Sequence, residues 1–112
     1  MIKVTVLYPR TAESHFDFDY YLNTHMPDSI ARLGSAMERI EVERLVPLGP
    51  PWPEPEYHAI CTFCCESRQV FEEAFFPHME SLQSDAPNYT DVEQIVLFSE
   101  IEISRDRDAL NG

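Results

Sequence analysis

The chain has 112 residues, of which 44% are hydrophobic and 25% are charged, and its formal net charge is −12. This length and composition fit one globular domain and exclude a globally disordered chain. The negative charge argues against nucleic acid and anionic membrane surfaces, because proteins bind both through Lys and Arg. No apolar run approaches the roughly 20 residues that span a bilayer. We therefore expect neither nucleic acid nor a membrane among the partners.

The N-terminal third of the sequence predicts a strand and an interrupted helix. Hydrophobic residues alternate with period two over residues 1–8, which indicates a strand. Asp17 can cap a helix in which apolar residues recur at helical spacing. Pro27 disfavours helical geometry at its predecessor but suits a first helical turn. We therefore expect a break at Met26 and a second helical segment that ends near Gly34.

The middle of the sequence predicts two strands joined by a surface loop. Alternation over residues 38–49 suits an edge strand that is exposed on one side. Four prolines between residues 49 and 56 exclude regular structure and favour an extended loop. Residues 57–67 are apolar at odd and at even positions, which face opposite sides of a strand, so both faces of this strand should be buried.

Three cysteines, Cys61, Cys64 and Cys65, cluster in the last of these strands. Their spacing gives neither a disulfide framework nor a paired zinc site. The first ten residues lack the apolar segment and the cleavage site of a secretory signal. We therefore expect a cytoplasmic protein whose reduced thiols fill the core.

The C-terminal part predicts a second helix and a fourth strand. Ser67 can cap a helix with an apolar stripe, which Pro77 interrupts. An apolar run followed by alternation over residues 92–104 indicates the last strand. The order β-α-β-β-α-β is that of a ferredoxin-like α+β fold, in which both helices cover one face of a four-stranded antiparallel sheet. We expect this single domain over residues 1–104 and a short tail over residues 105–112.

The second face of such a sheet would be left without helices. The third and fourth predicted strands carry apolar residues on both of their faces, so some other surface should cover the face without helices. A second copy of the sheet, related by a twofold axis, would bury it and protect the sheet edges. We therefore expect a homodimer with two sheets packed face to face.

The first predicted helix holds the strongest candidate for chemistry. Tyr21 and His25 are four residues apart, so they are neighbours on one face of the helix. An imidazole titrates near neutral pH and can take and return a proton. A histidine at a helix end can equally be structural, because the helix dipole favours its cation. The residues alone leave both interpretations open.

At this motif the chain resembles the EthD family, named for a protein of ethyl tert-butyl ether degradation, within the dimeric α+β barrel superfamily. The family pattern F-D-x-x-Y-Y-x-x-x-H-x-P is matched at Phe16, Asp17, Tyr20, Tyr21, His25 and Pro27. The family motif D-x-P-N-[FY]-T-D, before the last strand, is matched at Asp85, Pro87, Asn88, Tyr89, Thr90 and Asp91. On residue chemistry the second block is also standard for a turn, which we favour over a ligand site.

The resemblance implies a homodimeric α+β barrel with a small apolar cleft in each subunit, approached by His25. The wider superfamily includes cofactor-independent monooxygenases, lactone isomerases and haem-using enzymes, so the resemblance spans several reactions. We prefer a cofactor-independent, monooxygenase-like oxidoreductase, or a related proton-transfer enzyme, that acts on a small apolar or aromatic molecule. His25 would be the general base, and Tyr21 would orient it or donate a hydrogen bond to the substrate. The residues expected to line the cleft are Tyr8, Tyr20 and Phe63.

Three alternatives stay open. Deprotonation of a phenol or an enol also begins a lactone-type isomerisation on the same site. A non-catalytic carrier would use the cleft for a hydrophobic intermediate, and His25 would only form a hydrogen bond. Haem or metal chemistry is suggested by four histidines but opposed by the lack of compact ligand spacing, so we expect neither cofactor nor metal. The other histidines, His15, His58 and His78, are expected at the surface.

Overall fold

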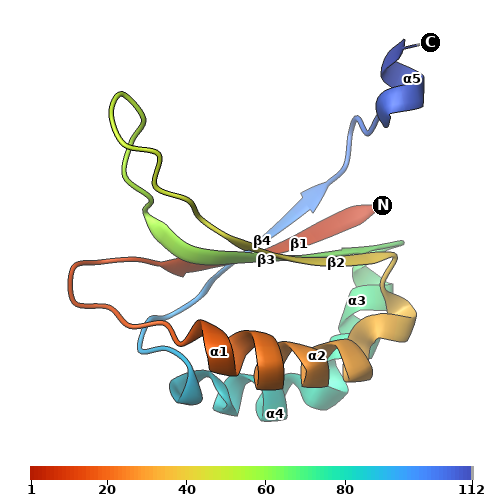
Figure 1. Ribbon diagram of the computed structural model, residues 1–112. Coiled ribbons are helices and arrows are strands. Elements are labelled where there is room, and N and C mark those ends of the chain that lie inside the picture. Colours follow the sequence, from red (N-terminus) through yellow and green to blue (C-terminus); the bar gives the residue numbers. More distant parts are fainter. Residues whose placement is uncertain (112) are drawn as a thin grey trace.

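The computed structural model describes residues 1–111 and contains one antiparallel sheet with helices on a single face (Figure 1). The strands follow the sheet order β2-β3-β1-β4. They are β1 (Ile2–Pro9), β2 (Arg39–Arg44), β3 (Tyr57–Cys65) and β4 (Ile95–Glu100). The predicted ferredoxin-like α+β fold is therefore confirmed, with β2 at one edge as expected.

The first helical layer is continuous, and the predicted break at Met26 is wrong. The layer consists of α1 (Phe18–Tyr20), a π-helical turn (Tyr21–His25), α2 (Met26–Leu33) and a 3-10 turn (Gly34–Ala36). The Asp17 carboxylate caps it by accepting the backbone N–H of Tyr20 over 3.1 Å. Pro27 would clash with the carbonyl four residues earlier in an ideal α-helix. The wider π turn directly before it lets the helix pass through the proline without ending.

The second helical layer is interrupted where the sequence predicts. It runs through α3 (Arg68–Phe75), a 3-10 turn (Phe76–His78), α4 (Met79–Ser84) and a further 3-10 turn (Ala86–Asn88). The Ser67 hydroxyl accepts the Val70 N–H over 3.2 Å and so caps α3. Pro77 lies in the first of the 3-10 turns, between α3 and α4.

The core lies between the sheet and the helices. Pairing of Val4 with Phe63, and of Val6 with Cys61, puts alternate residues of β1 and β3 on the helix side. The end of β3 is buried on both faces, as predicted, from Cys61 to Cys65. All three cysteines are buried free thiols. Cys61 and Cys65 fill the core as predicted, whereas Cys64 lies on the opposite face of the sheet. By contrast, every residue of the edge strand β4 is exposed. Its side chains Val96 and Phe98 line the open cavity, and Ile95 and Leu97 lie on the outer face, which no helix covers.

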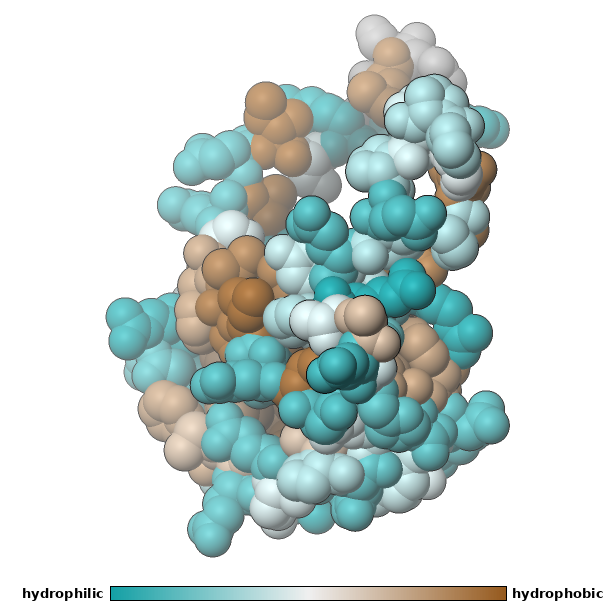
Figure 2. Space-filling view, turned by 90° about the vertical axis from the view of Figure 1, so that its left-hand side faces the viewer, coloured by the Kyte–Doolittle hydropathy of each residue, from teal (hydrophilic) through white to brown (hydrophobic). Residues whose placement is uncertain are grey.

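The outer face of the sheet is not covered by helices (Figure 1). Strand register places Leu7, Ile60 and Leu97 on this face. The loop between β2 and β3 and the C-terminal segment, which ends in α5 (Arg107–Asn111), both project beyond it. Hydrophobic side chains lie at the surface of both projections (Figure 2), namely Val46, Leu48, Trp52, Ile103 and Leu110. The homodimer stays a prediction. Among the described residues, no helix is long and apolar enough to cross a membrane.

Candidate functional site

A cavity of about 880 Å³ lies between the helical layers and the sheet. Its sheet wall is apolar and includes Val6, Phe63 and Phe98, whereas Tyr21, His25 and Ser29 line it from the first helical layer. Phe98 lies on the exposed edge strand β4, so the cavity is open to solvent along that edge. Small-molecule sites commonly enclose about 300–1,000 Å³ between apolar walls with a few polar groups. The cavity therefore has the size and the lining of a small-molecule site.

His25 is paired with an acidic residue at the wall of this cavity. Only 7% of His25 is exposed, and its Nδ1 lies 2.9 Å from Oδ2 of Asp85. Because a carboxylate only accepts hydrogen bonds, Nδ1 carries the proton and donates it to Asp85. Nε2 has no hydrogen-bond partner among residues 1–111. In the neutral form of the imidazole, Nε2 is therefore an unpaired acceptor.

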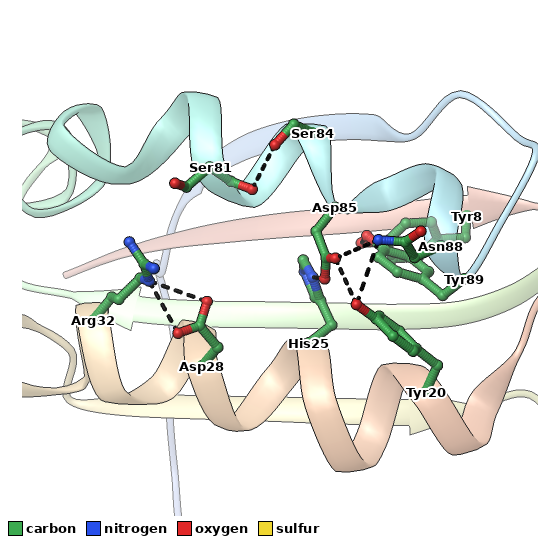
Figure 3. A network of polar contacts seen from close by, with 10 residues as sticks. All are labelled: Tyr8, Tyr20, His25, Asp28, Arg32, Ser81, Ser84, Asp85, Asn88 and Tyr89. Carbon is green, nitrogen blue, oxygen red and sulfur yellow. Dashed lines mark hydrogen bonds and ion pairs between the residues drawn. The ribbon is translucent and has the colours of Figure 1, made fainter.

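Two further side chains hold Asp85 in place (Figure 3). The Tyr20 hydroxyl donates to Oδ1 of Asp85 over 2.7 Å, and the Asn88 amide donates to the same oxygen over 2.9 Å. Burial alone would raise the pKa of the Asp85 carboxyl, but the hydrogen bonds from Tyr20, Asn88 and His25 lower it below its usual value. Asp85 is therefore ionised at neutral pH and fixed relative to the imidazole.

Aromatic rings fix the orientation of His25 from two sides. The Tyr21 ring stacks on the imidazole, with centroids 5.5 Å apart and planes 14° apart. The two residues span the π turn, whose wider geometry places them one above the other. On another side, the centroids of the His25 and Tyr89 rings are 4.6 Å apart. These rings and the bond to Asp85 leave the imidazole little rotational freedom.

Three buried phenols surround this part of the cavity. The hydroxyls of Tyr8 and Tyr89 are hydrogen-bonded at 3.0 Å. Tyr21 is 0% exposed, and its hydroxyl makes no hydrogen bond to any residue that the structure describes, although Tyr8 and Cys61 are close enough to influence its pKa. Burial is the main cause that raises the pKa of all three phenols above the ordinary value. The three phenols therefore stay protonated and neutral at physiological pH.

The structure brings most of the candidate residues together. Tyr8, Tyr21, His25 and Phe63 all line the cavity. Tyr20, expected in the lining, lies outside it and contacts Asp85 instead. The residues that the interpretation of the sequence missed are Ser29, Asp85, Asn88 and Tyr89.

The sequence signal was stronger for Asp85 than for Ser29. Asp85 begins the D-A-P-N-Y-T-D block, and residues Ala86–Asn88 do form the favoured turn. The same turn carries Asp85 to His25, so the turn and site interpretations of this block are compatible. Ser29 belongs to no motif, and its position four residues after His25 was the only available hint.

The remaining histidines lie outside the cavity lining. His15 is exposed, whereas His58 and His78 are half-buried. The Ser14 hydroxyl lies 2.8 Å from Nε2 of His58, and Nη1 of Arg32 donates to Nδ1 of His78 over 3.2 Å. Within the described part of the chain, no three His, Cys, Asp or Glu residues are grouped to hold a metal ion.

Comparison with known proteins shows which family the chain resembles. Residues 9–93 match the model of the EthD domain. The chain is similar to the crystal structure of an EthD-like protein from Ralstonia eutropha JMP134, with 39% sequence identity and a TM-score of 0.82. That alignment covers 93% of this chain and 94% of the other. The search of curated proteins gave no match.

Two more distant structures share the fold. An ethyl tert-butyl ether degradation (EthD) family protein from Bacillus halodurans C-125 is 21% identical, with a TM-score of 0.60 and coverage of 90% of this chain and 98% of that protein. HapK from Hahella chejuensis is 15% identical, with a TM-score of 0.53 and coverage of 93% and 97%. At these identities the likeness concerns the architecture alone.

Proposed function

This chain belongs to the EthD family, and we propose that it binds a small apolar or aromatic molecule in the cavity and removes a proton from it with His25. The observation that carries this proposal is the His25–Asp85 pair at the cavity wall, with Nδ1 and Oδ2 2.9 Å apart. The pair leaves the acceptor nitrogen Nε2 for a ligand.

The proposed chemistry is general base catalysis. Nε2 accepts a proton from the substrate, and the carboxylate of Asp85 stabilises the imidazolium that forms. A positioned base of this kind typically accelerates proton transfer by about 10²–10⁴-fold. Tyr21 acts as a positioning residue through its ring, and Tyr20 acts through Asp85. Tyr8 and Phe63 contact the substrate as parts of the lining.

The cavity favours a neutral molecule with an acidic O–H or C–H bond. Near His25 the sheet wall is apolar and the phenols are neutral, whereas the charged lining residues Arg68, Glu72 and Glu93 are exposed or half-buried. A charged group placed beside His25 would therefore lose hydration without compensation. Deprotonation of a phenol or an enol gives an electron-rich anion. We favour its reaction with dioxygen, in which a CH2 group becomes a carbonyl, one oxygen atom enters the product and the other leaves as water. This reaction would make the protein a cofactor-independent monooxygenase. Return of the proton to another carbon would make it a lactone-type isomerase.

The proposal includes a homodimer in the cytoplasm. Pairing of the outer sheet faces would cover Leu7, Ile60 and Leu97, which no helix covers. Three free buried thiols are ordinary in a reducing compartment.

A titration with 4-nitrophenol tests the base directly, because the phenolate absorbs at a longer wavelength than the phenol. We expect the bound probe to be largely phenolate at a pH where the free probe is mostly neutral. With His25→Gln the bound probe should be neutral, since the amide cannot take the proton. His78→Gln is the matched control, because His78 lies outside the cavity lining.

The same experiment separates an enzyme from a carrier. Equal binding of the neutral phenol by the wild type and by His25→Gln would show a cavity without a base. That result would support the carrier function, for which the apolar cavity alone is sufficient.

A further inference from the structure

Ser29 presents a second polar group to the cavity. Only 3% of the residue is exposed, and it belongs to the cavity lining. Buried hydroxyls are normally hydrogen-bonded, and a serine inside a helix commonly donates to the carbonyl four residues earlier. Ser29 makes no hydrogen bond from its side chain within the described chain. Its hydroxyl therefore has both a donor and an acceptor available for a ligand.

The placement of Ser29 relative to His25 determines how far apart these two polar groups are and which side of a ligand they face. The two residues are four apart at the start of α2, so their Cβ atoms are about 5–6 Å apart on one helix face. Both line the same wall, and the sheet residues Val6 and Phe98 line the opposite side. A flat apolar molecule against the sheet would therefore present one edge to both polar groups.

We propose that Ser29 binds a second oxygen of the substrate and that the substrate is an aromatic molecule with two oxygens in a 1,3 relationship. This inference rests on the proposed function of the cavity. Oxygens in a 1,3 arrangement are separated by about 5 Å and point to the same side of the ring, as one helical turn requires. Adjacent oxygens are too close together for this spacing, and oxygens in a 1,4 arrangement point to opposite walls.

The second oxygen contributes to the chemistry as well as to binding. In the keto form of such a molecule, loss to His25 of a proton from the carbon between the two oxygens spreads the negative charge over that carbon, the first oxygen and the second oxygen. The Ser29 hydroxyl can donate to that oxygen, so it stabilises the anion more than the neutral molecule. Ser29 thereby selects substrates in which deprotonation at His25 activates the carbon between two oxygens.

Titrations of 2-naphthol and 1,3-dihydroxynaphthalene, followed by fluorescence or calorimetry, test this inference. In the wild type the second hydroxyl should tighten binding by about tenfold, the effect of one buried hydrogen bond. Ser29→Ala should lose this gain and keep its affinity for 2-naphthol. Ser35→Ala, in the exposed turn after α2, should behave as the wild type. The isomer 2,3-dihydroxynaphthalene should show no gain in any of the three proteins.

The outcomes separate this inference from the proposed function. An equal gain for 1,3-dihydroxynaphthalene in the wild type and in Ser29→Ala would overturn the role of Ser29 but leave the base intact. An equal loss of affinity for both naphthols in Ser29→Ala would make Ser29 a packing residue and overturn it too. Failure of the wild type to bind any naphthol would overturn both proposals.

Discussion

Asp85 and His25 are 60 positions apart in the sequence, yet Oδ2 of one lies 2.9 Å from Nδ1 of the other. The turn at Ala86–Asn88 brings Asp85 to the first helical layer, where the π turn ends at His25. Asp85 thereby decides which nitrogen of the imidazole carries the proton. The proposed base depends on this one contact.

Replacement of Asp85 by Asn should weaken His25 as a base, but the probe should still bind in the cavity. The amide cannot stabilise an imidazolium, so the phenolate fraction of bound 4-nitrophenol should fall at least about tenfold. Three hydrogen bonds to a carboxylate are weakened, so the free energy of unfolding should drop by about 2 kcal/mol. An unchanged phenolate fraction would show that His25 does not need Asp85.

The stability effect of Asp85 should depend on pH with a defined sign. The folded-state pKa of this carboxyl is lowered, so its contribution is present above the unfolded value of about 3.9 and is lost as pH falls through the folded value. Urea unfolding of the wild type and of Asp85→Asn should therefore give curves that differ at neutral pH and converge below about pH 4. A constant difference down to the acid transition would contradict this assignment.

Tyr20 should influence the site only through Asp85. Tyr20→Phe removes the 2.7 Å hydrogen bond and should cost about 1 kcal/mol of unfolding free energy. It should also lower the phenolate fraction of bound probe by a few-fold, and leave the affinity for neutral 2-naphthol unchanged. Tyr57→Phe is the matched control, because the Tyr57 hydroxyl has no hydrogen bond among the described residues. Loss of naphthol affinity in Tyr20→Phe would instead place Tyr20 in contact with the ligand.

The order of the strands and helices was predictable because local patterns determine it. Alternation identified β1, capping residues identified both helical layers, and Pro77 marked a real interruption. The break predicted from Pro27 was wrong, because a proline can either end a helix or follow a π turn within a continuous helix. Which of these occurs depends on tertiary contacts of Tyr21 and His25, which local sequence does not encode.

The candidate site was predictable only in part, for a different reason. His25 and Tyr21 are neighbours on one helix and belong to a recognisable motif, so their pairing could be anticipated. The contact of His25 with Asp85 joins distant segments, and residue chemistry alone favoured a turn there. Whether a serine such as Ser29 is buried without a partner depends on what faces it across the fold.

The partnerless hydroxyl of Tyr21 predicts an unusual stabilising substitution. Tyr21→Phe keeps the ring stacked on His25 and removes a buried polar group that makes no hydrogen bond within residues 1–111, so the protein should gain about 1 kcal/mol in unfolding free energy. Tyr89→Phe is the matched opposite, because it leaves the Tyr8 hydroxyl without its partner and should cost about 1–3 kcal/mol. Thermal and urea denaturation measure both. Destabilisation by Tyr21→Phe together with loss of the phenolate signal would show that its hydroxyl has a functional partner.

Cys61 should make the protein less stable in alkali. Burial raises the pKa of its thiol to about 12. In the unfolded chain this thiol loses its proton near pH 8.5, so the unfolded state binds fewer protons and stability falls as pH rises from there. The slope should reach about 1.4 kcal/mol per pH unit for this group. Cys61→Ala should reduce the slope between about pH 8.5 and 10 and leave the slope below pH 8 unchanged. Equal slopes for both proteins above pH 8.5 would contradict a buried neutral thiol.

The outer sheet face should be the surface at which two copies meet. Leu97 is 50% exposed on β4. It pairs with Thr5, whose neighbours in β1, Val4 and Val6, point into the cavity, so Thr5 and Leu97 both point away from the helices. In a dimer of packed sheets, Leu97→Lys would bury an unpaired charge and weaken association by at least about 2 kcal/mol, or roughly 30-fold. Ile30→Lys is the control, because Ile30 is comparably exposed on α2, on the opposite side of the molecule. Sedimentation at micromolar concentration should show a dimer for the wild type and for Ile30→Lys, and a monomer for Leu97→Lys. A monomeric wild type would mean that the exposed apolar residues of this face do not pair two copies.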